Sequence, residues 1–479
     1  MTPAPLLTPL RTLLLTLLLT LLLTLLLTLA APALAQPEPG PAPDLSSRLE
    51  QAWKANDTAQ LASILDDAWT NDPVSAKKRT LQVLASDSDL FRPAAIAALG
   101  RHADAETLAS VIRSTNRRAV GERRWLTYAL SDRPKEESAE HLTALLRDQD
   151  LLIRAAAATG LARLKDPALL EPLLPLLREH PAWKPESSGD DQHSLQMALF
   201  GAIENATHQR PASSRDAKAA LASLQDSPPS TPDPDKKPER FSLRGKTFLI
   251  LPRFNLSFDL GPAAQISDAR VRQLEKEVFP VADRMNAAAT KVFGPLLPAS
   301  VRLIIADQQR FSGYAGNSFR PGVSQGNQVV LREMSPELTE QVLGHEYIHV
   351  LHEAAFPKQP RWLMEGMAES ISLSTAESVW NLEEVRRAGL ERDVSKAVFA
   401  AILNWDGAAS SGDQETRLYR LAHMAVDSLR FGPYGDRDVR LFLMMSRIGE
   451  GENPNAVLKS LYGADPRELD RRLQQWLAR

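Results

Sequence analysis

Apolar residues recur with helical spacing through the first half of the chain, in segments separated by polar turns. The run FRPAAIAALG at residues 91–100 is similar in kind to LIRAAAATGL at residues 152–161. Each run is followed by a polar turn that contains aspartate and by a second leucine-rich segment, and similar units begin near Arg117 and His193. A spacing of about 30–37 residues is typical of paired helices that stack into a solenoid. We therefore expect residues 45–225 to form helical repeats.

The pattern changes after residue 225. Residues 226–240 (DSPPSTPDPDKKPER) combine five prolines with polar residues and cannot build a core, so they predict an extended linker. A linker of this kind shares few contacts with either side, so each half is expected to fold alone. In residues 241–479, short apolar runs predict strands and amphipathic runs predict helices. The strands are 246–251, 301–305 and 328–332; the helices are 267–293, with a kink or split at Pro280, and 417–429, 439–448, 456–461 and 466–478.

The first 35 residues are expected to direct export. Arg11 precedes a tract of leucine and threonine that ends in Ala33-Leu34-Ala35, an A-x-A cleavage pattern. The tract at residues 12–31 is also long enough to span a bilayer, so an uncleaved anchor in the inner membrane is the alternative. Either way the body of the chain is periplasmic or extracellular, with a membrane contact only through this segment. Residues 36–44 form a proline-rich lead-in.

Composition narrows the chemistry. With 56 Lys and Arg against 59 Asp and Glu, the chain has no strongly basic domain, and nucleic acid is not an expected partner. An apolar content of 43% is ample for packed cores. The chain has no cysteine, which excludes disulfides, thiolate ligands and a cysteine nucleophile. Any zinc site must therefore use histidine and carboxylate.

The sequence HEYIH at residues 345–349 has the spacing of a zinc site on a helix. His345 and His349 lie on one face, about one turn apart, and can share a tetrahedral Zn²⁺. Glu346, one residue further round the helix, can reach a water at the metal without being a ligand. His352 lies on nearly the same face but about 10 Å from His345 along the axis, so packing or support of a ligand is expected of it.

A second predicted helix, residues 361–370, supplies the carboxylates. Glu365 is the candidate third ligand, and Glu369 follows one turn later on the same face. Glu369 could accept the free ring N–H of a ligating histidine and fix its tautomer. Three protein ligands leave a fourth position for water, which is the mark of a catalytic rather than a structural zinc site.

HEYIH followed by PRWLMEGMAES (360–370) resembles the gluzincin clan of zinc metallopeptidases. More narrowly, it is similar to the bacterial peptidase MA-like proteins, whose motif reads HE-x-x-H, a short loop, then P-x-W-(L/F)-x-E-G-x-A-E. The resemblance implies one Zn²⁺ per chain, the ligands His345, His349 and Glu365, the general base Glu346, and Glu369 in the shell behind the ligands. A GxMEN-type signature is absent, so aminopeptidase activity is not implied. The repeats of residues 45–225 resemble short bacterial HEAT-like repeats.

The family resemblance raises further expectations for the cleft. Its members carry a small mixed sheet whose edge strand can pair with an extended substrate; QVVLR at 328–332 is either that edge or an ordinary strand. Residues 309–327 read as a mobile loop that could cover the cleft. The tetrahedral oxyanion commonly meets a Tyr or His from a downstream helix, and Tyr419 or His423 could fill this role or simply pack the helix.

The sequence thus predicts an α+β chain: an all-α HEAT-like solenoid, then a gluzincin-type zinc peptidase domain at 241–479 with a helical C-terminal part. The expected function is that of an exported zinc metallopeptidase, in the first place an endopeptidase, that acts on peptide or protein substrates. The repeats would dock a substrate or a protein partner. The alternative is a catalytically silent adaptor that works through its repeats, although a silent copy would be expected to lose a ligand or Glu346.

Overall fold

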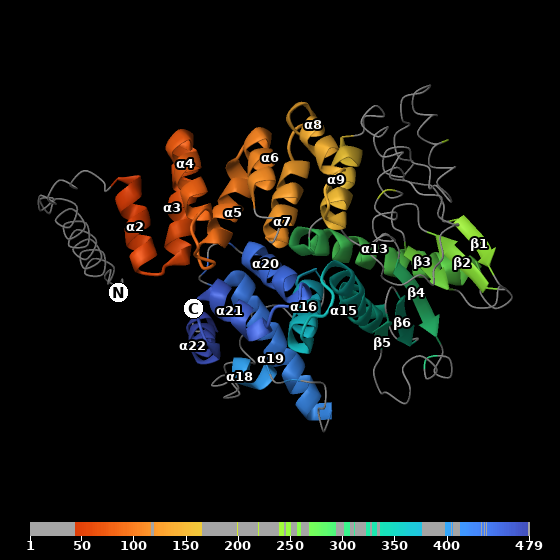
Figure 1. Cartoon of the computed structure of the whole chain (residues 1–479). Coiled ribbons are helices and arrows are strands. Elements are labelled where there is room, and N and C mark those ends of the chain that lie inside the picture. The colour runs from red at the N-terminus through yellow and green to blue at the C-terminus, as the bar shows by residue number, and fades with distance from the viewer. Residues whose placement is uncertain are drawn as a thin grey trace, which may run out of the picture. The chain divides into compact units, whose positions relative to one another are not determined.

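Helices dominate the computed structural model of the chain (Figure 1). The structure describes, with breaks, residues 44–115, 119–164, 239–293, 301–375 and 398–477. The predicted export segment, most of the proline-rich linker and the repeat units after residue 164 lie outside the described residues. Within the described part of the chain, no helix is long and apolar enough to cross a membrane.

The N-terminal helices pair and stack in two layers. Helices α3, α5, α7 and α9 contact one another in succession, while α6 contacts α8 in the other layer. Asp57, Asp72 and Asp104 cap α3, α4 and α6, each accepting a hydrogen bond from the backbone N–H three residues on. This is the arrangement of a helical solenoid. Its helices are α2 (Leu45–Lys54), α3 (Thr58–Asn71), α4 (Pro73–Leu84), α5 (Arg92–His102), α6 (Ala105–Ser114), α7 (Val120–Ser131), α8 (Lys135–Leu145) and α9 (Leu151–Arg163).

A six-stranded sheet has the order β1-β2-β3-β4-β6-β5. The pairs β3–β4 and β4–β6 are parallel and the other pairs are antiparallel. The run QVVLR is β6, and it lies inside the sheet between β4 and β5, so of its two interpretations the ordinary strand is correct. The strands are β1 (Glu239–Leu243), β2 (Lys246–Ile250), β3 (Leu256–Asp259), β4 (Val301–Ala306), β5 (Gly322–Gln325) and β6 (Gln328–Arg332).

The edge strand beyond β6 comes from an unexpected place. Strand β5 is formed by residues 322–325, which the sequence predicted to be part of a mobile loop. Its four residues, GVSQ, are too few and too polar to be recognised as a strand from the sequence. The strand forms by antiparallel pairing with β6. That part of the loop prediction was therefore wrong.

Helices from the remaining chain pack beside the sheet. Helix α13 (Asp268–Phe293) runs continuously through Pro280, so the helix is not split there. Helix α15 (Pro336–Ala355) contacts β5, β6, α13 and α16 (Arg361–Thr375), and α16 packs on α19 (Gly412–Phe431) (Figure 1). The other C-terminal helices are α18 (Val398–Ile402), α20 (Asp438–Gly449), α21 (Pro454–Tyr462) and α22 (Pro466–Leu477).

The repeats and the C-terminal helices are not separate. Helix α20 packs against α5 and α7, and Phe442 contacts Trp125 and Tyr128 edge to face, with ring centroids 5.2 and 5.6 Å away. At residue 121 of α7 an added Cβ would lie 2.8 Å from the Ser446 Cβ, so glycine permits the close approach. Residues 51–479 cluster as one unit. The repeats and the C-terminal helices therefore share a packed interface, whereas the linker had led us to expect each half to fold alone.

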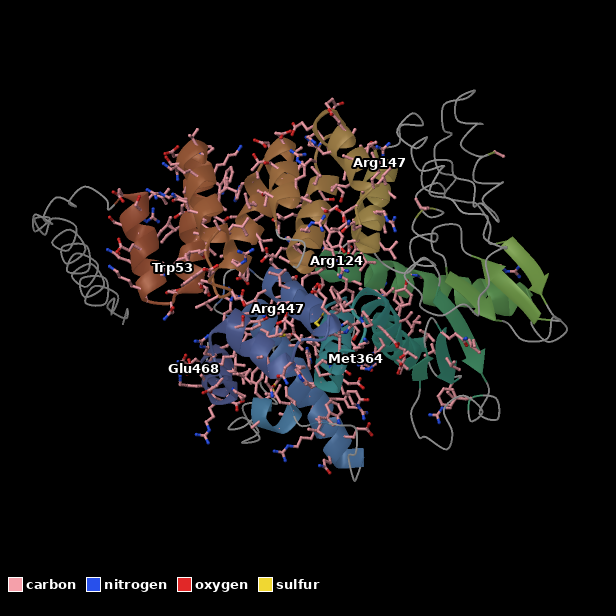
Figure 2. All side chains as sticks on the ribbon, viewed as in Figure 1. Trp53, Arg124, Arg147, Met364, Arg447 and Glu468 are labelled. Atoms are coloured by element: carbon pink, nitrogen blue, oxygen red, sulfur yellow. The ribbon has the colours of Figure 1, made fainter. Side chains whose placement is uncertain are left out.

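A buried ion pair lies at this junction. Arg440 on α20 is fully buried and pairs with Asp436, which is 1% exposed. Its guanidinium also donates to the carbonyl oxygens of Leu461 and, at 3.0 Å, of Leu90 in the repeats. Nearby, Arg447, labelled in Figure 2, donates to Asp89 over 2.8 Å. The segment before α5 thus contacts the C-terminal helices directly.

Candidate metal centre

Two helices bring three ligand-type side chains together. His345 and His349 lie one turn apart on α15, and Glu365 lies on α16. The chain reverses between the two helices, and the Pro360 carbonyl accepts the N–H groups of residues 363 and 364 in the first turn of α16. Trp362, 1% exposed, anchors this turn in the core. Packing of α16 on α15 then turns Glu365 toward the histidines.

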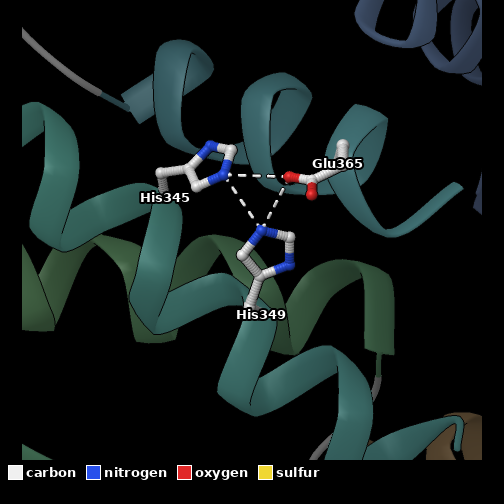
Figure 3. Close-up of side chains that lie close together, drawn as sticks. All are labelled: His345, His349 and Glu365. Carbon is white, nitrogen blue, oxygen red and sulfur yellow. Dashed lines mark hydrogen bonds and ion pairs between the residues drawn. The ribbon is translucent and has the colours of Figure 1, made fainter. Parts of the chain in front are cut away.

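The three side chains converge on a common point (Figure 3). The Nε2 atoms of His345 and His349 are 2.9 Å apart, and the Glu365 Oε2 lies 3.2 and 2.9 Å from them respectively. These side chains are only 15%, 11% and 8% exposed. No placement of the two ring protons makes all three contacts hydrogen bonds, so the arrangement favours a cation between the three atoms. This group can hold a metal ion, as the sequence motif predicted.

Glu369 lies behind the first histidine. Its Oε1 is 3.1 Å from Nδ1 of His345, so the ring presents Nε2 to the common point. Burial opposes protonation of His345, but hydrogen bonds to Glu365 and Glu369 outweigh it and raise its pKa well above the usual value. Burial also favours neutral Glu369, yet the hydrogen bond to His345 lowers its pKa. His345 therefore lies between two carboxylates, with Glu365 at Nε2 and Glu369 at Nδ1.

Glu346 stands outside the group of three and faces the edge strand. An added Cβ at Gly322 of β5 would lie 3.0 Å from the Glu346 Cγ and 2.4 Å from the Val342 Cγ1. Glycine is therefore required for β5 to lie this close to α15. The edge strand and the candidate general base are in contact, which no local sequence signal indicated.

The two candidates on α19 have different surroundings. The Tyr419 hydroxyl donates to Oε1 of Glu365 over 3.3 Å, and its ring centroid is 5.9 Å from that of His345. His423, one turn later, pairs instead with Asp427 over 3.1 Å and is 4% exposed. Burial opposes the charge on His423, but Asp427 outweighs it and raises the pKa. The structure thus brings Tyr419 to the three ligand-type residues and places His423 in a buried ion pair.

Three further residues, which the sequence did not single out, lie beside the site. Arg361 forms ion pairs with Glu365, 3.4 Å away, and with Glu415, 2.8 Å away, and its guanidinium stacks over Trp405. The spacing of four between Arg361 and Glu365 on a helix was a usable signal. Trp405 and Glu415 carry no local signal, because they reach the site through packing of distant segments.

His352 is packed among aromatic rings, one of the two roles expected of it. It is fully buried, and its ring stacks on Phe293 with centroids 5.3 Å apart. Burial lowers its pKa to about 3, with a smaller effect from His349 in the same direction. It is therefore neutral in the fold and does not join the group of three.

No protein-family model matches the chain, and no curated protein matches it in sequence. Only the geometry of its own residues therefore bears on its function.

Proposed function

We propose that the chain is a zinc-dependent metallopeptidase that hydrolyses peptide bonds, with one Zn²⁺ held by His345, His349 and Glu365. The observation that carries this proposal is the convergence of two imidazole nitrogens and one carboxylate oxygen, backed by Glu369 on His345 Nδ1. Two imidazole nitrogens and one carboxylate oxygen are one of the donor sets found in catalytic zinc sites. Zinc there would supply Lewis acidity toward a substrate carbonyl and toward water.

The remaining chemistry falls to side chains of this chain. Glu346 would take a proton from the attacking water and pass it to the leaving amine. Its place beside the ligands, but outside their group, supports this role. Tyr419 supplies a hydroxyl near Glu365 that could donate to the oxygen where negative charge develops. The placement of His423 in its own ion pair argues for a supporting role for that residue instead.

The edge strand suggests how substrate would bind. Among the described strands, β5 pairs with β6 alone, so its other edge can accept an extended peptide. Gly322 brings this strand against the Glu346 side chain. A peptide added there would run past the base, which supports cleavage within extended or unfolded segments. An exported location, with the repeats offering a surface to a protein partner, completes the proposal.

The decisive test separates metal binding from chemistry. Glu346→Gln in the full chain should keep zinc, whereas turnover of a peptide library should fall by about 10²–10⁴-fold, as is typical of losing a general base. Glu353→Gln, the same change at an exposed position of α15, is the matched control and should behave as wild type. A zinc-loaded wild type that cleaves nothing would instead support the adaptor alternative. A fully active Glu346→Gln would remove that residue from the mechanism.

A further inference from the structure

The two oxygens of Glu365 have different neighbours. Oε2 faces the Nε2 atoms of His345 and His349, at 3.2 and 2.9 Å. Oε1 faces away from them, toward the Tyr419 hydroxyl at 3.3 Å and the Arg361 Nε at 3.4 Å. A carboxylate can bind a cation through one oxygen or through both. In this fold only one of the two oxygens lies with the histidines.

Arg361 is itself held on three sides. Besides Glu365, its Nη2 is 2.8 Å from the Glu415 Oε1, and its guanidinium carbon lies 4.7 Å from the centre of the Trp405 ring. Trp405 is 7% exposed and contacts Tyr419 edge to face, with ring centroids 5.4 Å apart. A planar guanidinium that contacts an indole ring and two carboxylates has little freedom to rotate away from Glu365.

We infer that Arg361, assisted by Tyr419, is a positioning residue that retains Oε1 of Glu365 and so reserves Oε2 alone for the metal. This inference rests on the proposed function. Arginine suits the task because it is always charged and its fork can engage both Glu365 and Glu415, which lysine cannot do in the same geometry. A one-oxygen ligand keeps a position free for water, which a two-oxygen ligand would occupy.

A second explanation of Arg361 must be separated from this one. An arginine at the rim of a peptidase site could instead bind the free carboxylate at the end of a peptide substrate. Arg361 already contacts two carboxylates of its own chain, which favours the positioning role. A matched pair of peptides, one with a free C-terminal carboxylate and one with a C-terminal amide, distinguishes the two explanations.

The test uses the full chain loaded with Co²⁺ in place of zinc, because the visible absorption of Co²⁺ weakens when coordination rises from four to five. Arg361→Met should weaken the visible bands at equal metal content and reduce metal affinity by about 10–100-fold, as loss of a partner behind a ligand does. Arg361→Lys should recover part of the effect. Tyr419→Phe, which removes one hydroxyl, should change the spectrum in the same direction by a smaller amount. This variant keeps the inference testable if Arg361→Met folds poorly.

A matched control is available on α19. Arg420→Met, at an exposed position beside Tyr419, should leave the spectrum and the affinity unchanged. Unaltered cobalt spectra and affinity in all three site variants would overturn the inference, and so would a rise in KM confined to the free-acid peptide. A wild type that fails to bind one metal ion per chain would instead overturn the proposed function itself.

Discussion

The candidate metal centre and the junction at Arg440 are both buried clusters of polar side chains, but their polar groups are satisfied in different ways. At the junction the Arg440 guanidinium finds acceptors within the same chain: it contacts Asp436 and the carbonyl oxygens of Leu461 and Leu90. At the candidate metal centre His345 and His349 direct Nε2 toward each other and toward a carboxylate oxygen, so no placement of the ring protons makes all three contacts hydrogen bonds. Buried polar groups are normally satisfied. The first cluster therefore holds structure, whereas the second needs a cation or a proton from outside.

The largest expected effect is on zinc binding at the candidate metal centre. Replacing both His345 and His349 by alanine should abolish zinc binding, which we expect at about one ion per wild-type chain because three ligands complete the site. Zinc content after dialysis is the measurement. His102→Ala is the control, since that histidine pairs with Asp66 in the repeats. Stoichiometric zinc in the double variant would show that the ligands are elsewhere.

Next in size is removal of the repeats. From the proline-rich linker we expected each half to fold alone. The structure predicts that a fragment lacking residues 36–240 is less stable, because Phe442 would lose Trp125 and Tyr128 and Arg440 would lose the Leu90 carbonyl. Circular dichroism and limited proteolysis of the two chains provide the comparison. A fragment that unfolds at the same temperature as the full chain would show that the junction contributes nothing to stability.

A single substitution at the Arg440 junction tests its contribution to stability. Arg440→Met leaves Asp436 buried without its partner and should lower the free energy of unfolding by about 3–5 kcal/mol. Adding Asp436→Leu should restore most of the loss, since an apolar pair can replace a buried ion pair. Arg467→Met, at an exposed position of α22, should change stability by about 0.5 kcal/mol or less. Chemical denaturation measures all three, and a single variant as stable as the control would contradict the assignment.

The smallest effect depends on pH. Burial would raise the pKa of Asp89, but hydrogen bonds from Ser460 and Arg447 outweigh it and lower the pKa. A lowered pKa stabilises the fold above the unfolded value near 3.9, and this contribution is lost as pH falls through the lower folded value. Because the side chain is 44% exposed, solvent screening limits it to about 1 kcal/mol. Asp89→Asn should therefore be less stable than wild type at pH 6, and the gap should close in acid.

The sequence predicted what depends on neighbours along the chain. The spacing of four between His345 and His349 survives in any helix, and α5, α15, α16 and α20 follow from local apolar patterns. The sequence could not decide whether Tyr419 or His423 lies at the site, because the two residues share one face of α19. Only the packing of α16 on α19 places Tyr419 against Glu365 and His423 against Asp427.

Other features depend on contacts that have no local pattern. Strand β5 exists because β6 offers it an edge, and its four residues alone resemble a loop. Trp405 and Glu415 reach Arg361 from segments about fifty positions away in the sequence. The junction joins residues still further apart, so the proline-rich linker was a poor guide to whether the two halves touch.

The contact between Ser460 and Asp89 joins positions 371 residues apart. A ribosome delivers the repeats long before it delivers α20 and α21, so the surface of α5 and α7 exists before the helices that cover it. Closing a loop of this length costs entropy, which the contacts between the later helices and the repeats must offset. The repeats therefore present a surface on which these later helices pack. Tyr419, which contacts Glu365, also lies in this later part of the chain, so the candidate metal centre is completed only after the repeats have been made.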